Sequence, residues 1–293
     1  PGDERNLLLN DRQVKFEKYL TDAFSEKAVE FINESSQPFM MYLAYNAVHT
    51  PMQATDEDMA KFEGHPRQKL AAMTYALDRG VGTVIRGLKD SGKFDNTLIF
   101  FLSDNGGATT NQSSNYPLKG FKGNKFEGGH RVPYFVVWKN GIPAGKPYDG
   151  LVSSLDIFAT AIDAASISKT RNRLDGVSLL PYLKGKKGEP HKVLYWRKMD
   201  TRAIRSGDYK LIITHGVDSV LYNIRRDPEE MNNLINKEPD LYRKLAKKLA
   251  KWEKNECIEP SWLEEGWRKI TNRYHQQLMH NEIKTAQDLY KKK

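Results

Sequence analysis

The chain has 293 residues and a formal net charge of +9, a length that suits one large domain and a small one. Hydrophobic residues make up 39% of it, and no apolar run approaches the roughly 20 residues that a membrane span needs. The single cysteine, Cys257, excludes a disulfide within the chain. No zinc-finger spacing, Walker loop or RNA-binding signature accompanies the basic charge, so we expect no nucleic-acid partner and no membrane span.

The first part of the chain alternates between two patterns. Apolar residues at helical spacing predict helices over residues 22–33, 67–88 and 154–165. The inward stripe of the second helix is expected to comprise Leu70, Met73, Leu77, Val81, Val84 and Leu88.

Three apolar, β-branched or aromatic runs lie among these helices, at residues 41–46, 96–101 and 134–138, and each is typical of a buried strand. Strands that alternate with helices predict a largely parallel α/β sheet.

The pattern changes near residue 185. Short strand-like runs at residues 193–196, 201–205, 209–213 and 220–222 predict a small antiparallel sheet. An amphipathic helix over residues 239–254 is expected to cover it with Leu241, Leu245, Leu249 and Trp252. The predicted parts are therefore an α/β part over 1–185, an antiparallel α+β subdomain over 186–256, and a helical extension over 257–293 whose function the sequence leaves open.

Polar side chains follow the predicted strands where each one ends. Asp104 and Asn105 come directly after the second strand, and His49 follows the first. Ligands of open α/β sheets bind at such strand ends, and adjacent carboxylate and amide oxygens suit Ca²⁺ or Mg²⁺. Taken singly, an ordinary turn explains Asp104 and Asn105, and a structural hydrogen bond explains His49.

A glycine- and lysine-rich loop precedes the third predicted strand, over residues 117–133. Glycine lets a backbone approach a ligand closely, and lysine supplies a point charge for an oxyanion. The candidate lysines are Lys122 and Lys119, although Lys119 also suits a role in supporting the loop. The three strand ends together predict one site for an anionic substrate.

Several motifs in order carry a family resemblance. They are the runs at residues 39–51, 103–107, 122–133, 153–156 and 175–180, followed by 221–223 with 227–228. In these motifs the chain, from about Tyr19 to about Leu234, resembles the C-terminal portion of a formylglycine-dependent sulfatase of the alkaline phosphatase-like superfamily. The resemblance implies a mostly parallel sheet flanked by helices, with a smaller antiparallel sheet after it.

One motif of that family does not occur. Such sulfatases carry their nucleophile in a Cys- or Ser-x-Pro-x-Arg motif, in which the cysteine or serine becomes formylglycine. The sequence contains no such motif, and Ser36-Gln37-Pro38-Phe39-Met40 departs from it at the last position. We therefore expect formylglycine in a missing N-terminal segment, and no turnover from residues 1–293 by themselves.

The resemblance also assigns roles to residues. Asp104 and Asn105 match two metal ligands of the family, with Ca²⁺ as the expected cation and Mg²⁺ as the alternative. Lys122 matches a lysine that contacts sulfate, and His49 matches a histidine at the sulfate or the leaving oxygen, where it can transfer a proton. Lys119 and His130 are further candidates for contact with the substrate, whereas Glu127 and Arg131 are expected to tie the loop to the next strand.

The function implied is sulfuric ester hydrolysis of a sulfated small molecule or glycan, in a periplasmic or secreted protein. Sulfated glycans are favoured because the chain is basic and its motifs resemble those of bacterial glycan sulfatases. Two alternatives stay open: a phosphodiesterase or phosphonate hydrolase of the same superfamily, and a catalytically inactive truncated chain that binds anions. The particular sulfate ester and the oligomeric state are not predicted.

Overall fold

The computed structural model describes residues 7–15, 17–167, 173–257 and 265–291. The chain divides into two compact units, residues 1–97 and residues 98–293, each with its own internal packing. This division differs from the boundaries near residues 185 and 257 that the sequence suggested. It falls between a 3-10 turn, η1 (Phe94–Asn96), and the first strand of the second unit.

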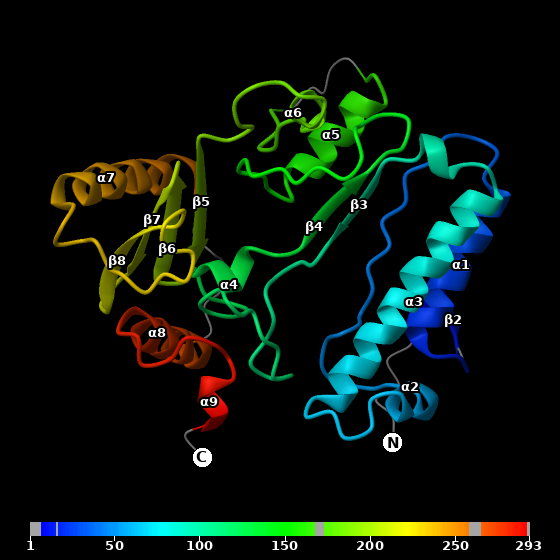
Figure 1. The fold of residues 1–293 in the computed structure, drawn as a ribbon, viewed down its shortest axis with the longest axis horizontal. Helices are drawn as coiled ribbons and strands as arrows, with labels where there is room; N and C mark the ends of the chain where they lie inside the picture. Colours follow the sequence, from blue (N-terminus) through cyan, green and yellow to red (C-terminus); the bar gives the residue numbers. More distant parts are fainter. Residues whose placement is uncertain (1–6, 16, 168–172, 258–264, 292–293) are drawn as a thin grey trace. The chain divides into compact units, whose positions relative to one another are not determined.

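The first unit is built on two long helices that lie side by side (Figure 1). Its elements are the hairpin β1 (Leu7–Leu9) and β2 (Arg12–Val14), the helices α1 (Leu20–Glu34), α2 (Asp56–Ala60) and α3 (Gln68–Asp90), and η1. The helices predicted over 22–33 and 67–88 are confirmed as α1 and α3, because their apolar spacing is a strong local signal.

The inward face of α3 differs from the predicted stripe. Met73 and Leu88 are buried, but the other buried positions are small, namely Ala72, Ala76, Gly80 and Gly87. A Cβ atom on Gly87 would lie 2.8 Å from Cγ2 of Val29 in α1, so the two backbones approach closely there. The helix interface therefore depends on small residues, which a search for large apolar side chains overlooks.

The prediction of a strand at residues 41–46 was wrong, because these residues are extended but not paired with any described strand. These residues pair with no strand among those that the structure describes, although side-chain exposure alternates along them. Tyr42, for example, is 89% exposed. The alternation is that of extended chain, but a strand also needs a neighbour to complete its hydrogen bonds.

The second unit begins with a two-stranded sheet formed by β3 (Ile99–Leu102) and β4 (Tyr134–Val137), which pair antiparallel. Both strands were predicted, but the described strands form only antiparallel pairs, so the parallel pairing expected from the strand–helix alternation was wrong for this part of the chain. Three short or medium helices complete this region: α4 (Glu127–His130), α5 (Asp156–Ala164) and α6 (Leu180–Leu183).

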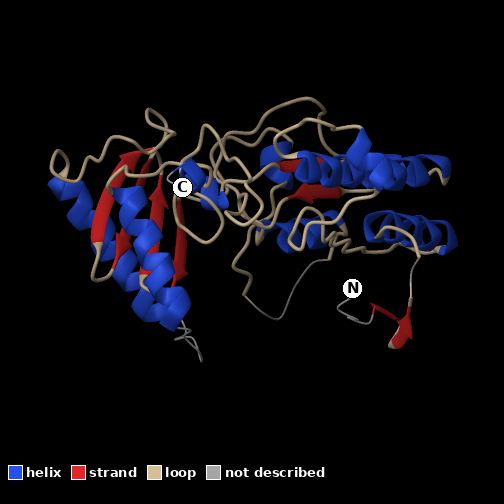
Figure 2. Cartoon of the chain, turned by 90° about the horizontal axis from the view of Figure 1, so that it is seen from below, coloured by secondary structure: helices blue, strands red, loops and turns tan. Residues whose placement is uncertain are grey.

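A four-stranded antiparallel sheet follows, in the order β5-β6-β7-β8, as predicted. Its strands are drawn next to one another in Figure 2; they are β5 (Val193–Lys198), β6 (Thr201–Ser206), β7 (Tyr209–Thr214) and β8 (Asp218–Asn223). The turn after Ser206 joins β6 to β7, and Gly207 supplies the positive φ of 55° that this tight turn requires.

Helices cover both faces of this sheet (Figure 1). The predicted cover, α7 (Pro239–Glu256), packs Leu245 and Leu249 against Ile204, Leu211 and Leu221. The opposite face, which includes Ile212 and Tyr222, packs against Leu278 and Met279 of α8 (Glu265–Met279).

The sequence had left residues 257–293 without a role. In the structure α8 is part of the core of the sheet, and α9 (Asp288–Lys291) follows it. None of the helices among the described residues is long and apolar enough to cross a membrane.

The contact between α1 and α3 leads to a prediction on stability. Alanine is about 1 kcal/mol better than glycine in a helix, but forcing an extra methyl group into a packed interface costs about 1–3 kcal/mol. We expect Gly87→Ala to lower the free energy of unfolding, because Val29 is branched and cannot move aside. Gly82→Ala, whose Cβ would meet only the flexible Arg86 side chain at 3.4 Å, is expected to raise it by about 1 kcal/mol. Chemical denaturation followed by circular dichroism measures both, and a change of the same sign in both variants would contradict the interpretation.

Candidate active site

The site begins at the end of β3, where Ser103 donates from its backbone to the carbonyl of Pro133 at 3.4 Å. Asp104 is exposed and Asn105 is half-buried. The next residue, Gly106, donates to the carbonyl of Gly129 at 3.1 Å, and a Cβ at Gly106 would lie 1.8 Å from the oxygen of Gly128. Only glycine allows this approach, which places the Asp104–Asn105 turn against the glycine-rich loop.

A second contact joins the same two loops near Lys122. The backbone N–H of Lys122 donates to the carbonyl of Gly107 at 3.0 Å. The Asn115 side chain accepts from Gly107 at 2.7 Å and donates to the carbonyl of Gly120 at 3.0 Å. The structure thus brings Asp104, Asn105 and Lys122 onto adjoining loops. Sequence reasoning missed Asn115. Its only distinguishing feature in the sequence is its place between two glycine-containing turns.

An ion network lies beneath the glycine-rich loop. Lys210 of β7 is fully buried, and its Nζ lies 2.8 Å from Glu127 in α4 and 3.0 Å from Glu230 after β8. Oε2 of Glu230 also accepts from the backbone N–H of Glu127 at 2.6 Å. Glu127 was expected to tie the loop to the next strand; in the structure it ties the loop to the four-stranded sheet.

The pKa values of the two carboxyl groups in this network are shifted in opposite directions. Burial alone would raise the pKa of Glu127, but the nearby Lys210 and Arg205 charges outweigh it and lower the pKa. Burial and the charge of Glu127 raise the pKa of Glu230, and Lys210 offsets them only in part. One buried ammonium is thus shared unequally between two carboxyl groups.

Lys119 is also buried completely, and its Nζ donates to the carbonyl of Glu230 at 3.0 Å and to the side chain of Asn281. Burial lowers the pKa of Lys119 to about 8. This setting favours the loop-supporting role over contact with substrate, which stays a prediction for Lys119.

His130 lies in the same network. Its Nε2 lies 3.2 Å from the carbonyl of Lys125 and 3.1 Å from Nζ of Lys210, and its ring stacks on Trp196 with 4.4 Å between centroids. Burial and, next, the charge of Lys210 lower the pKa of His130 to about 3. The imidazole is neutral near pH 7, so it is poorly suited to donate a proton to a leaving group.

His49 belongs to the first unit. It lies in a turn closed by a bond from its backbone N–H to the carbonyl of Asn46 at 2.8 Å, and its Nδ1 lies 2.6 Å from the carbonyl of Thr50. With Nδ1 as the donor, the neutral ring carries its lone pair on Nε2. The side chain is exposed. Its place beside Lys122 and Asp104 stays a prediction.

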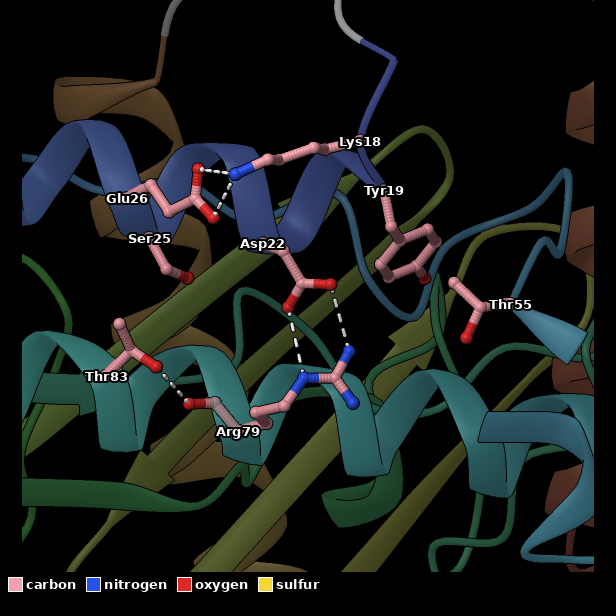
Figure 3. Close-up of a pocket in the computed structure, with 8 residues that line it drawn as sticks. All are labelled: Lys18, Tyr19, Asp22, Ser25, Glu26, Thr55, Arg79 and Thr83. Atoms are coloured by element: carbon pink, nitrogen blue, oxygen red, sulfur yellow. Dashed lines mark hydrogen bonds and ion pairs between the residues drawn. The ribbon is translucent and has the colours of Figure 1, made fainter. Parts of the chain in front are cut away.

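The first unit also has a pocket of about 300 Å³ between α1 and α3 (Figure 3). It is lined by Lys18, Tyr19, Asp22, Ser25, Glu26, Thr55, Arg79 and Thr83. Its charged side chains are already paired, since Lys18 lies 2.8 Å from Glu26 and Arg79 bonds to Asp22 at 3.0–3.1 Å.

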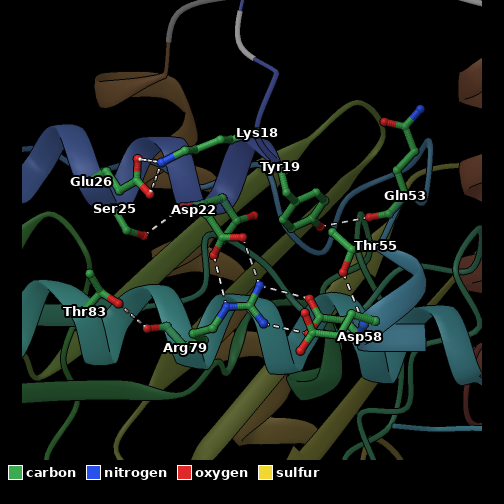
Figure 4. Close-up of polar contacts among 12 residues, drawn as sticks. Lys18, Tyr19, Asp22, Ser25, Glu26, Gln53, Thr55, Asp58, Arg79 and Thr83 are labelled. Carbon is green, nitrogen blue, oxygen red and sulfur yellow. Dashed lines mark hydrogen bonds and ion pairs between the residues drawn. The ribbon is translucent and has the colours of Figure 1, made fainter. Parts of the chain in front are cut away.

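Arg79 makes a second pair of bonds, to the buried Asp58 at 2.6 and 2.9 Å (Figure 4). These hydrogen bonds lower the pKa of Asp58 and raise that of Arg79. Four of the five N–H donors of Arg79 are engaged in these bonds, so Arg79 fastens α3 to α1 and α2, and we assign no substrate to this pocket.

Comparisons with known proteins bear on what these loops do. A family model described as sulfatase matches residues 3–167, and one described as the C-terminal part of N-sulphoglucosamine sulphohydrolase matches residues 122–255. The chain belongs to the sulfatase family. The family expected from the motifs is thereby confirmed.

Individual relatives agree with this assignment. An uncharacterized sulfatase of Escherichia coli, YdeN, is 39% identical over 65% of this chain and 36% of its own length. The N-acetylgalactosamine-6-sulfatase of Canis lupus familiaris is 32% identical over 66% of this chain and 38% of its own length. The crystal structure of Ps i-CgsB in complex with k-i-k-neocarrahexaose superposes with a TM-score of 0.81 at 36% identity, over 90% of this chain and 61% of that one.

These matches set the fold and its extent. The alkaline phosphatase-like α/β fold with a C-terminal antiparallel sheet, as predicted, is confirmed by the structural relatives. The chain spans 36% and 38% of the two curated relatives named above.

His130 gives the site a pH-dependent contribution to stability. An unfolded histidine has a pKa of about 6.5, whereas that of His130 is about 3 in the fold. As pH falls from 6.5 toward 3, His130 binds a proton in the unfolded state but not in the folded state, so the free energy of unfolding decreases. His130→Phe keeps an aromatic ring against Trp196 but cannot titrate. Between pH 7.5 and 5 the original protein should therefore lose up to about 2 kcal/mol more stability than the variant.

Urea denaturation at a series of pH values measures this difference. His275, which is buried in α8, titrates in both proteins, so its contribution cancels. Equal pH slopes for the two proteins would show that His130 is not held neutral in the fold.

Proposed function

We propose that this chain carries part of the active site of a sulfuric ester hydrolase whose substrates are sulfated glycans. The observation that carries the proposal is the bond from Lys122 N–H to the carbonyl of Gly107, because it joins the loop that holds Asp104 and Asn105 to the loop that holds the candidate sulfate-binding lysine. Family membership supports a sulfate ester over a phosphodiester or phosphonate as the substrate.

Asp104 and Asn105 are the proposed protein ligands of a divalent cation, with Ca²⁺ preferred and Mg²⁺ as the alternative. Both side chains stand at the end of β3 and offer oxygen atoms, and a carboxylate beside a neutral amide is a donor set that a hard cation accepts. Among the described residues no group of three or more acidic, histidine or cysteine side chains is arranged so that it could hold a metal ion. Such a cation would compensate the negative charge of a sulfate ester.

Lys122 and His49 are the proposed residues for substrate chemistry. The Lys122 ammonium is held by its loop as a point charge for the sulfate oxygens. His49, with Nδ1 directed to the Thr50 carbonyl, would contact the sulfate or move a proton at Nε2. Formylglycine, when present, supplies the oxygen nucleophile, and we infer that it lies outside residues 1–293.

The preference for glycans draws on the basic charge of the chain and on its relatives. One relative is named an N-acetylgalactosamine-6-sulfatase, and the solved structure at 36% identity is described as a complex with a neocarrahexaose. We propose by the same family resemblance that the protein is periplasmic or secreted. Inactivity of residues 1–293 by themselves stays a prediction of the missing nucleophile motif.

The anion site can be tested through its two lysines. In catalytically active protein that includes a formylglycine-bearing segment, we expect Lys122→Ala to reduce turnover by about 10²-fold or more, the scale of losing one preorganised donor to an oxyanion. Lys119→Ala should cost much less turnover per folded molecule, because that ammonium is buried beneath the loop. The measurement is kcat on an aryl sulfate, normalised to folded protein. Equal losses would mean that both lysines contact sulfate or that Lys122 is the wrong one.

The metal ligands can be tested in the same protein. Asp104→Ala should abolish activity and weaken Ca²⁺ binding, since it removes a charged ligand, whereas Asn105→Ala removes a neutral one and should do less damage. Isothermal titration with Ca²⁺ after chelation and dialysis measures the affinities. Full activity of the dialysed, chelator-treated enzyme would contradict the proposed cation site.

A further inference from the structure

Lys198, the last residue of β5, reaches the loop that carries Lys122. Its Nζ lies 2.9 Å from the position that a Cβ atom on Gly123 would occupy, so the ammonium rests against the backbone of the residue after Lys122. Gly123 has a φ of 95°, a backbone conformation that favours glycine. The four-stranded sheet thus delivers a second cation to the proposed anion site.

The backbone of Lys198 is held firmly. It pairs with Thr201 at the end of the β5–β6 ladder, and the turn between them contains Asp200. Asp200 accepts from Arg268 and Asn272 of α8, each at 2.7 Å. The position of Lys198 is therefore fixed by α8 as well as by the sheet.

No carboxylate among the described residues pairs with Lys198 or with its neighbour Lys125, and both side chains are half-buried. Burial and the charge of Lys122 lower the pKa of Lys198; burial and the charges of Lys198 and Lys210 lower that of Lys125 to about 8. Protein neighbours thus oppose the charge of these two lysines rather than stabilise it.

Two histidines lie near these lysines, His275 in α8 and His130 in α4, whereas the carboxylate of Glu127 in α4 is paired with Lys210. His275 is buried, its Nδ1 lies 2.9 Å from the carbonyl of Thr271, and its Nε2 has no hydrogen-bond partner among the described residues. Burial lowers the pKa of His275 to about 4 and that of His130 to about 3, so both rings are neutral near pH 7. No carboxylate among the described side chains is paired with Lys198, which leaves its charge available to an anionic ligand.

On the sulfatase function proposed above, we propose that Lys198 binds a second sulfate group of the substrate, next to the sulfate ester that Lys122 holds. A sulfate ester carries one negative charge, which Lys122 and the proposed divalent cation already compensate. Lys198 and Lys125 are two further cations next to Lys122, and a second sulfate on the same glycan would compensate their charge. The substrate class is therefore a glycan with at least two sulfate groups, and Lys198 is a specificity-determining residue.

Binding without catalysis tests this assignment. The probes are a galactan disaccharide with one sulfate on each sugar and the same disaccharide with a single sulfate. Their affinities for residues 1–293 are measured by isothermal titration at constant ionic strength. The unaltered chain should prefer the disulfated probe. Lys198→Gln should remove most of that preference, weakening the disulfated probe by about tenfold, as expected for one partly desolvated ion pair. It should leave the monosulfated probe nearly unchanged.

Two controls accompany the measurement. Lys198→Arg keeps the charge and should restore the preference, and Lys192→Gln removes an exposed lysine just before β5 and should have no effect. Thermal unfolding confirms that each variant folds. An equal loss for both probes in Lys198→Gln, no loss, or no preference in the unaltered chain would overturn the inference.

The same titrations separate this inference from the proposed function. Lys122→Ala should weaken both probes, because it removes the cation for the sulfate that they share. If Lys122→Ala changes neither affinity while Lys198→Gln removes the preference, the assigned role of Lys122 fails and the second-sulfate site stands. If only Lys122→Ala acts, the proposed function stands and the role of Lys198 is refuted.

Discussion

Lys210 is a fully buried ammonium between the carboxyl groups of Glu127 and Glu230, and the geometry of the glycine-rich loop depends on it. Removing one partner from a buried pair costs about 3–5 kcal/mol, because a charge is left without compensation. The network therefore helps to hold the loop in position as well as to stabilise the fold. The loop in turn determines the backbone position of Lys122.

The C-terminal helices extend this control to the rest of the loop. Gly120 donates to the carbonyl of Lys284 at 2.7 Å, and Lys119 bonds to Asn281, both after the end of α8. Through Asp200, α8 also fixes the β5–β6 turn that follows Lys198. The helix α8 and the segment that follows it thus pack against the second face of the sheet and contact both the glycine-rich loop and the turn after Lys198. Residues 257–293 are part of the construction of the site rather than an appendage.

The sequence predicted features that depend on neighbours along the chain. The helices α1, α3 and α7 have strong apolar periodicity, and the four-stranded sheet has short strands with turn residues between them, so both were found. The strand over residues 41–46 was not confirmed because pairing depends on distant chain. Contacts that span great sequence distances were missed for the same reason: Lys210 and Glu127 are 83 residues apart, and Lys119 and Asn281 are 162 apart.

The candidate site divides in the same way. Asp104, Asn105 and Lys122 were predicted from motifs, and the bonds between Gly107 and Lys122 and between Gly106 and Gly129 join their loops. Lys198 belongs to no such motif, because its significance comes from a hairpin that reaches the loop from 75 residues further along the chain. A lysine in a basic chain has no local signal that separates a solvated charge from a buried one.

The glycine-rich loop meets two demands that oppose each other. Close contact between the Asp104–Asn105 turn and the loop requires glycine at position 106, and close contacts within the loop require it at positions 128 and 129. Glycine loses more backbone entropy on ordering than any other residue. A charged side chain that must meet a sulfate group, however, has to start from a fixed backbone. The buried ion pairs of Lys210 with Glu127 and Glu230 meet both demands, because they fix the backbone of a loop whose glycines do not restrict it. Such a loop can approach a ligand closely with its backbone and still present Lys122 in one place. Larger residues would prevent the close approach, and without the ion network the backbone of Lys122 would not be fixed.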